Sequence, residues 1–436
     1  MGRHNAVRGA GPRRWRRSLL LLVGLPMGFA AMAYGIGGLR MRSARRGWAR
    51  CFGSLESILE HFPKKGPDPR VHRLDESTRA LGIAMRGVPP ASPSSEGEFT
   101  RLRTFTEAAS TDDTLDAPPP EVAAFLERNE AAVAAIESDL LESGDLEWEL
   151  DLPRGYDAPI PPLLGIRRLH DVLVARALLA AYRGDHAEAD RALEAAWRLG
   201  RSLHGRPELF CQLLALELTG TRNGVLRRVR GLPATWAERT ISSHVVSAMR
   251  RAYQSEAYWL SRFGDGRTGL ADLDLRIVDP DVVDLQTLPR APAAVFRFAT
   301  APVVQAGIAG TLDRFRLSLE PMLGADPCAP DPEALAKEAE APLPRWNVVG
   351  GAALPGMLRA WARLTHARLD AELTRVVLEA RRSPPPSPRA LVPSAVCPRL
   401  TWVATAADGH VTIAADPAEP LVHPSARPWR FTLSGP

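Results

Sequence analysis

Two parts of the sequence have the residue types of a metal site. His366 and Asp370 are four residues apart in a predicted helix, so both side chains lie on one face. A second segment, 264–290, is rich in aspartate: Asp265, Asp272, Asp274, Asp279, Asp281 and Asp284. Two ligands are too few for a metal, and the aspartates lack the alternate spacing around a central glycine of an EF-hand. We therefore expect a local hydrogen bond or ion pair at His366–Asp370, a solvated acidic loop, and no metal site.

Three short segments contain acid–base or nucleophilic residue types: His170-Asp171, Asp185-His186, and Ser202 with His204. Neighbouring residues on a helix point to different faces, so neither His–Asp pair is a catalytic dyad. Asp185 is predicted to be a helix N-cap instead. Ser202 and His204 lie in GRSLHG, which is not the GxSxG motif and has no strand before it. None of these residues is predicted to be catalytic.

Glu256 is the strongest candidate for a general acid. It lies among Tyr253, Tyr258 and Trp259 in a largely apolar predicted helix, and burial would raise the pKa of its carboxyl group. An ion pair with a nearby arginine is the alternative, and it is favoured. The sequence has no P-loop, dinucleotide-binding glycine motif or HExxH motif. We therefore assign no catalytic, cofactor-binding or metal-binding residue, and expect no cofactor.

Residues 18–39, SLLLLVGLPMGFAAMAYGIGGL, contain no charged side chain. At about 1.5 Å per residue, a helix of this length extends roughly 33 Å, enough to cross the hydrocarbon core of a bilayer. The sequence thus predicts a transmembrane helix at 18–39 that binds the lipid bilayer, after a basic cytoplasmic leader at 1–17. Eleven arginines flank the segment: Arg3, Arg8, Arg13, Arg14, Arg16, Arg17, Arg40, Arg42, Arg45, Arg46 and Arg50.

Three interpretations of this helix remain open. A cleaved signal peptide is indicated by Ala31-Met32-Ala33, but the apolar run continues to Leu39 and arginines follow. An uncleaved anchor is favoured, because an early helix with a short basic leader usually sends its C-terminal body across the membrane. The reverse orientation is the third interpretation, since the flanking charges barely differ. We expect a single-pass protein of the cell membrane with its body on the extracytoplasmic side.

The basic charge is concentrated at the N-terminus. Residues 1–50 hold 11 of the 55 Lys and Arg residues and none of the 50 Asp and Glu residues. The rest of the chain has 44 basic and 50 acidic residues, a net charge of −6. Because nucleic-acid binding needs clustered basic residues, this acidic body excludes a broad nucleic-acid interface.

The four cysteines, at 51, 211, 328 and 397, have no CxxC or zinc-ligand spacing. Cys211 is predicted to be buried in the apolar run LFCQLLALEL. Cys328 and Cys397 lie in Pro-flanked loops. They could pair if the body lies outside the cytoplasm.

The body is predicted to be helical. Residues 40–119 hold short helices within 54–62 and 75–85, then a Pro- and Ser-rich spacer over 88–120. A helical domain covers 120–382, beginning at Pro120-Glu121. Its helices are expected at about 120–140, 166–182, 186–200, 209–229, 234–260, 293–323 and 354–381.

The last segment, 383–436, changes to a period of two. Strands are predicted at 400–405, 410–414 and 430–433, with Asp408-Gly409 as a hairpin turn. So small a β unit needs support and should dock on the helices. The fold class is therefore mainly α, with an N-terminal transmembrane helix, helical hairpins and a small C-terminal β-hairpin unit.

Residues 173–200, within LVARALLAAYRGDHAEADRALEAAWRLG, resemble one tetratricopeptide unit. Small and apolar residues fall at that repeat's positions, with Gly184-Asp185 at the turn. No second unit follows at a 34-residue period, so the resemblance implies one tetratricopeptide-like helical pair. The layout as a whole also resembles a broad set of uncharacterised bacterial membrane-anchored helical proteins, which implies no catalytic residue.

Three functions are compatible with these features. The leading hypothesis is a non-enzymatic, membrane-anchored helical scaffold or interaction module of the bacterial cell envelope, with a protein partner. The second is an enzyme of unrecognised type, such as a hydrolase that uses Glu256 or the acidic loop. The third is a structural part of an export or surface assembly, docked through the C-terminal hairpin. All three are hypotheses by analogy of fold.

Overall fold

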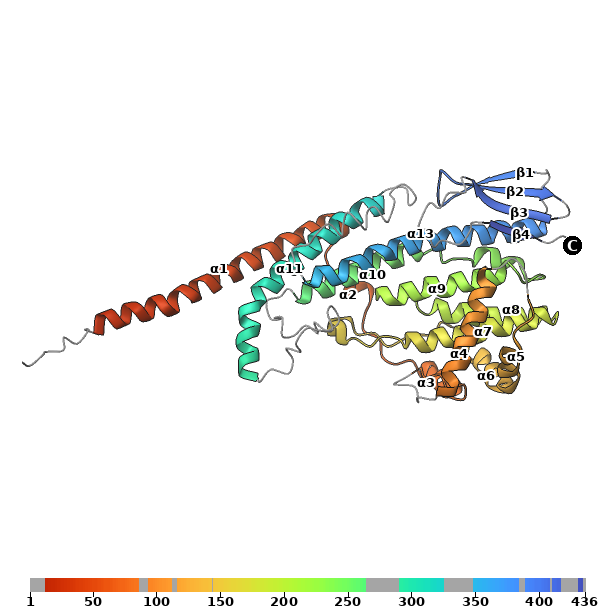
Figure 1. The fold of residues 1–436 in the computed structure, drawn as a ribbon, viewed down its shortest axis with the longest axis horizontal. Helices are drawn as coiled ribbons and strands as arrows, with labels where there is room; N and C mark the ends of the chain where they lie inside the picture. Colours follow the sequence, from red (N-terminus) through yellow and green to blue (C-terminus); the bar gives the residue numbers. More distant parts are fainter. Residues whose placement is uncertain are drawn as a thin grey trace, which may run out of the picture. The chain divides into compact units, whose positions relative to one another are not determined.

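Helices make up most of the chain in the computed structural model, and a small antiparallel sheet follows the last helix (Figure 1). The structure describes residues 12–85, 93–111, 116–142, 144–263, 290–324, 348–383, 389–407, 410–416 and 430–433. The helices are α1 (Pro12–Phe52), α2 (Ile58–His61), α3 (Pro69–Arg79), α4 (Pro93–Thr111), α5 (Pro120–Arg128), α6 (Glu130–Leu141), α7 (Leu163–Tyr182), α8 (His186–Arg201), α9 (Leu209–Leu226), α10 (Val245–Phe263), α11 (Arg290–Gly324) and α13 (Val348–Arg382). Short 3-10 helices lie at Leu152–Asp157 (η1) and Ala234–Glu238 (η2). The strands are β1 (Arg389–Pro393), β2 (Thr401–Ala407), β3 (His410–Asp416) and β4 (Arg430–Leu433).

The chain divides into two compact units. Unit 1 contains Met1–Ser54, Trp259–Arg316 and Pro342–Leu354. Unit 2 contains Leu55–Tyr258, Leu317–Ala341 and Pro355–Pro436. Helices α10, α11 and α13 therefore each contribute residues to both units.

In unit 1, α1 packs on α11 through one face. The buried residues of that face recur at helical spacing: Gly37, Met41, Ala44 and Trp48. A Cβ atom on Gly37 would lie 2.7 Å from Oε1 of Gln305, so a larger residue here would require the Gln305 side chain to shift. The rings of Trp48 and Phe315 lie 5.4 Å apart. This face of α1 is thus occupied by the packing of unit 1.

The predicted membrane helix lies within α1. Of the helices in the described part of the chain, none has the length and apolar character that a membrane span needs. The side chains of residues 12–27 lie outside the described part, and this range includes the first ten residues of the predicted segment 18–39. The helical conformation is confirmed over the whole segment, and its crossing of a membrane stays a prediction.

In unit 2, the predicted helical hairpin forms α7 and α8. Asp185 is the N-cap of α8, as predicted, and accepts a hydrogen bond from the backbone N–H of Glu188 at 2.9 Å. Gly184, with φ of 80°, adopts the left-handed conformation that the short turn requires. The inward residues of α8 are buried against α7: Ala189, Leu193, Ala196 and Leu199. The pairing of these helices is therefore confirmed.

Several predicted elements differ in the structure. The helix expected at 75–85 is α3, which begins and ends about six residues earlier, and the one expected at 120–140 is divided into α5 and α6. Part of the expected spacer forms helix α4, whose Phe99 and Leu102 are buried in the core with α7. The expected helix at 234–260 is divided into η2 and α10. Nη2 of Arg222 donates hydrogen bonds to the carbonyl groups of Arg239 and Thr240, at 2.8 and 3.3 Å. A continuous helix would use these carbonyl groups for its own hydrogen bonds.

The predicted strands are confirmed as β2, β3 and β4, and β1 adds an edge strand that the sequence did not indicate. The order is β1-β2-β3-β4, antiparallel throughout, with Trp402 opposite Val392 and Ala415. The inner face of the sheet packs on α13, as predicted. The shared cluster includes Leu369, Leu373, Val376, Val377, Cys397, Leu400, Trp402, Ile413 and Phe431.

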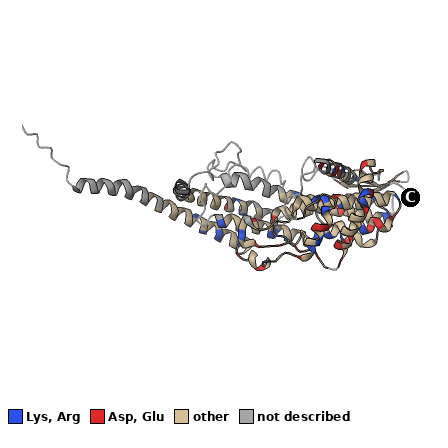
Figure 2. Ribbon diagram, turned by 90° about the horizontal axis from the view of Figure 1, so that it is seen from below, with Lys and Arg blue, Asp and Glu red and all other residues tan. Residues whose placement is uncertain are grey.

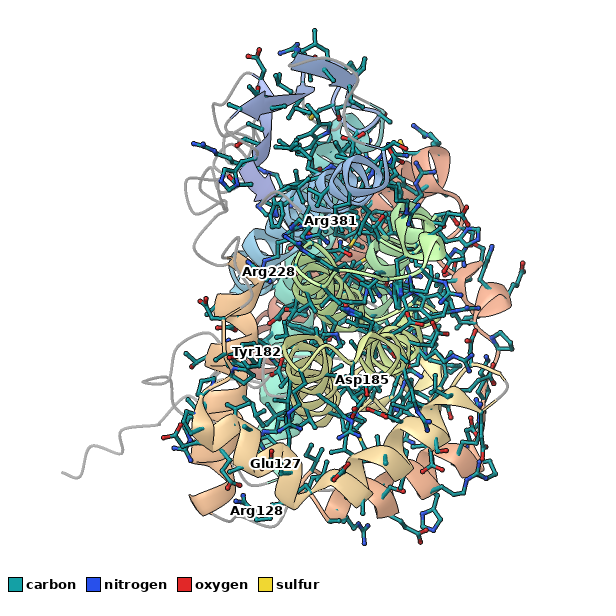
Figure 3. All side chains as sticks on the ribbon, turned by 90° about the vertical axis from the view of Figure 1, so that its right-hand side faces the viewer. Glu127, Arg128, Tyr182, Asp185, Arg228 and Arg381 are labelled. Carbon is teal, nitrogen blue, oxygen red and sulfur yellow. The ribbon has the colours of Figure 1, made fainter. Side chains whose placement is uncertain are left out.

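A second face of α13 holds α9. Asp370 accepts hydrogen bonds from Arg227 at 2.9 Å and from Asn223 at 3.2 Å. Arg381 donates to the carbonyl groups of Leu226 and Val229, at 3.2 and 3.0 Å, and so caps the C-terminal end of α9. Figure 3 labels Arg381 beside Arg228 at this end of the helix.

We predict that Asp370→Asn lowers the free energy of unfolding by roughly 3 kcal/mol or more, because it leaves the buried Arg227 without a counter-charge. The measurement is chemical denaturation of the purified protein, followed by circular dichroism. Glu379→Gln is the matched control on the same helix, since its carboxylate is exposed and 3.9 Å from Arg375. Equal stability of the two variants would contradict the assigned role of the Arg227–Asp370 pair.

Candidate functional site

The loop between α8 and α9 is held by a buried arginine. Arg206 is only 3% exposed and donates two hydrogen bonds to Glu208, at 2.9 and 2.5 Å. Its other contacts are the carbonyl groups of Trp148 at 3.3 Å, Glu149 at 2.5 Å and Pro159 at 2.8 Å. This guanidinium group therefore fixes residues 148–159 to the start of α9 and has its donors in use.

Glu256 of α10 lies at the same place, and 7% of it is exposed. Its carboxyl group accepts a hydrogen bond from the backbone N–H of Leu209 at 3.4 Å. The pKa of Glu256 is raised to about 7: burial raises it most, the Leu209 N–H lowers it, and the charge of Glu208 raises it. The predicted rise in pKa is confirmed. Among the described residues, no arginine pairs with Glu256, the favoured alternative, and the nearby Arg206 pairs with Glu208.

A carboxyl group with a pKa near 7 can donate or accept a proton at neutral pH. The neighbouring Cys211 is buried, and burial raises the pKa of its thiol, so it is not a nucleophile at neutral pH. Glu256 is thus the acid–base candidate among the described residues of this site.

An apolar surface lies over this end of α7 and α9. Three large side chains are exposed, Ile160 by 48%, Leu164 by 57% and Phe210 by 67%. The ion pair Arg167–Glu217 sets the register of the two helices. Leu164 is one turn before Arg167 on α7, and Phe210 is two turns before Glu217 on α9. Each therefore lies on the face of its helix that carries the ion-pair residue. Pro159, next to Ile160, is held by Arg206. We call Ile160, Leu164 and Phe210 the α7–α9 apolar surface.

In the structure, the other candidate residues are helix caps or buried polar groups. Ser202 accepts from Nε1 of Trp148 at 2.9 Å and donates to the carbonyl of Leu199 at 2.7 Å, so its hydroxyl is structural. Burial lowers the pKa of His204 to about 4 and that of His170 to about 3, with Arg222 adding to both effects. Both histidines are therefore neutral at physiological pH.

Asp171 is also buried, which raises its pKa to about 7. Thr106 of α4 contacts its carboxyl group at 3.4 Å, and Arg167 opposes the rise. His170 and Asp171 point to different faces of α7, as the sequence indicates, and form no dyad.

Asp370 pairs with Arg227 of α9, a longer-range contact than the local one predicted with His366, which stays a prediction. The acidic loop at 264–290 lies outside the described residues, apart from Arg290. Within the described ranges, no group of three His, Cys, Asp or Glu side chains is placed to hold a metal ion.

The cysteines occupy different environments. Cys51 is an exposed free thiol and Cys211 a buried one, as predicted for Cys211. Cys397 is disulfide-bonded and buried beneath the sheet. Cys328, the partner that the sequence suggested, lies outside the described residues.

Sequence reasoning missed the contacts that build the site. Arg206 and Glu208 stand on either side of Pro207 in an otherwise ordinary loop, and the backbone carbonyl partners of Arg206 are 47 to 58 residues away. A charged pair just before a strongly apolar helix was the available signal. The exposed apolar side chains gave no signal, since single apolar residues at helix starts are common.

Comparison of the chain with known protein families, with curated proteins and with solved structures finds no match.

We predict that Glu256→Gln stabilises the protein by an amount that grows with pH. The folded-state pKa, about 7, is above the ordinary value of 4.5, so the wild-type carboxyl group loses its stabilising effect as the pH rises through this window. The difference between variant and wild type should increase by roughly 3 kcal/mol between about pH 4.5 and 8.

The measurement is the free energy of unfolding at several pH values. The exposed Glu238→Gln is the control, and its difference from wild type should stay constant. A Glu256→Gln difference that does not change with pH would disprove the raised pKa.

Proposed function

We propose that this protein is a membrane-anchored helical interaction module of the bacterial cell envelope. Residues 18–39 of α1 serve as its single membrane span, and its body lies on the extracytoplasmic side, where the α7–α9 apolar surface binds a protein partner. The observation that carries the proposal is the exposure of Phe210 and its neighbours over a rigid, fully bonded base.

The anchor is supported by the exposed face of α1. Large apolar side chains on that face are between 49% and 69% exposed: Phe29, Met32, Ile36 and Leu39. Exposed apolar stripes of this length are costly in water and favourable in a bilayer. The basic residues of α1, with no acidic residue among them, suit the membrane boundary (Figure 2).

The extracytoplasmic side is supported by the disulfide of Cys397, because disulfides persist in oxidising compartments and are rare in the cytoplasm. This bond lies in the cluster that joins the sheet to α13, so oxidation would stabilise the body where it is proposed to work.

The interaction surface is supported by its position. Arg206 makes two contacts with the side chain of Glu208 and three with backbone carbonyl groups of residues 148–159, so a partner would meet Phe210 at the start of a helix whose preceding loop is held in place. Rigid aromatic anchors lose little entropy on binding and dominate many protein interfaces. The tetratricopeptide-like pair α7–α8 belongs to the same helical layer.

We predict that Phe210→Ser abolishes partner capture, because it removes the largest exposed apolar side chain of the surface. The measurement is affinity capture of the tagged full-length protein from its native membrane, with quantitative mass spectrometry of the retained proteins. Tyr182→Ser is the matched control, since Tyr182 is a 53% exposed aromatic residue at the far end of α7 (Figure 3).

The expected result is a stoichiometric partner that wild type and Tyr182→Ser retain and Phe210→Ser loses. Retention of the same proteins by all three forms, or a preparation with no partner, would contradict the proposed surface.

A second candidate function, an enzyme of unrecognised type, is favoured by one observation, the pKa of about 7 at Glu256. If this second function is correct, Glu256→Gln would abolish an activity that wild type shows in a metabolite screen. Phe210→Ser would then have no effect in the partner-capture experiment.

A further inference from the structure

The two faces of α1 have different roles in the region after Leu39. The inward face continues through Met41, Ala44 and Trp48, which are buried in unit 1. Arg45, on the side of this face, donates to the carbonyl group of Ser261 at 2.8 Å. The opposite face makes no such contact with the described part of unit 1, and its side chains are exposed.

The exposed face changes character within one turn. Phe29, Met32, Ile36 and Leu39 recur at helical spacing and are followed by exposed arginines: Arg40, Arg42, Arg46 and Arg50. At about 100° per residue, Leu39, Arg46 and Arg50 lie within roughly 40° of one another around the helix. The apolar stripe of α1 is therefore continued after residue 40 by Arg46 and Arg50, and Arg40 and Arg42 flank it on either side.

These arginines lack counter-charges. Within the described residues, Arg40, Arg42 and Arg50 make no ion pair, and Arg46 contacts only the backbone carbonyl of Arg42, at 3.3 Å. By contrast, several exposed arginines of helices α3 to α5 pair with a carboxylate, as Arg73 does with Glu142 at 2.7 Å. Four unpaired positive charges on about 15 Å of helix attract an anion of matching extent.

We infer that Arg40, Arg42, Arg46 and Arg50 form a binding band for the phosphate groups of anionic phospholipids, while the stripe from Phe29 to Leu39 lies among their acyl chains. This inference rests on the proposed membrane anchor. A guanidinium group binds phosphate oxygens through paired hydrogen bonds. The change from apolar to cationic along one stripe matches the order of acyl chain and headgroup in a lipid.

The depths along the helix agree with this assignment. Arg40 and Arg42 follow Leu39 by about 1.5 to 4.5 Å, which places them at the headgroups when Leu39 is at the hydrocarbon boundary. Arg46 and Arg50 stand about 10 to 17 Å above it, and their long side chains can reach back toward the surface. The first pair would bind phosphate directly, and the second would add attraction at a distance.

The test uses the full-length protein reconstituted in vesicles of phosphatidylcholine with a minor fraction of phosphatidylglycerol. Spin-labelled forms of each lipid report, by electron paramagnetic resonance, how much of that lipid is held at the protein surface. We expect phosphatidylglycerol to be preferred about tenfold, and the preference to disappear when all four arginines are replaced by Gln. Replacement by Lys should retain most of it, because the charge remains.

Arg250→Gln with Arg251→Gln is the control, since both residues are exposed on the part of α10 in unit 2. Equal association of the two lipids with wild type, or a preference that survives the fourfold Gln replacement, would overturn the inference while leaving the anchor intact. Failure of wild type to insert into vesicles of either composition would overturn the proposed anchor itself.

Discussion

The buried ion pair between Arg227 and Asp370 is the contact on which the arrangement of unit 2 depends most. Both side chains are less than a tenth exposed, and the bond joins residues 143 positions apart. Burying two charges costs several kcal/mol each, and the geometry must recover that cost through further hydrogen bonds. Asn223 and Thr374 supply them, at 3.2 and 2.6 Å. The pair therefore fixes one position of α13 against α9. Arg381, near the C-terminal end of α13, makes a second contact with α9 and so fixes the direction of α13.

The opposite face of α13 carries a second buried carboxylate with a similar role. Glu372 accepts hydrogen bonds from Nε1 of Trp402 at 3.0 Å, from the backbone N–H of Ala395 at 2.6 Å and from the hydroxyl of Ser394. These donors come from β2 and from the loop that precedes it, so the sheet is held by polar contacts as well as by its apolar face. A four-stranded sheet of short strands is weakly stable alone. Because both carboxylates stand on α13, that helix transmits the position of α9 to the sheet.

The local sequence pattern was sufficient to predict those elements whose structure is decided by neighbouring residues. The Gly184-Asp185 turn, the period of two in β2 and β3, and the apolar setting of Glu256 were all readable, and the structure bears them out. Long-range partners were not readable. Helix α4 has few apolar residues among Pro, Ser and Thr, and it is ordered because Phe99 and Leu102 pack on α7. The sequence indicated His366 as a local partner of Asp370 but gave no sign of Arg227, which the fold brings to this carboxylate. Side chains that pair across more than a hundred residues have no characteristic spacing in the sequence, so such a pair cannot be predicted from it.

In the proposed function a membrane anchor carries an oxidised, helical interaction body, and the central claim is the side of the membrane on which that body lies. Cys51 is an exposed free thiol at the end of α1, directly after the arginine band. The most direct measurement is labelling of Cys51 with a membrane-impermeant maleimide in spheroplasts of bacteria that express the full chain, with Cys51→Ser as the blank. The account predicts that intact spheroplasts are labelled as fully as permeabilised ones. Labelling that requires permeabilisation would place the body in the cytoplasm and contradict it.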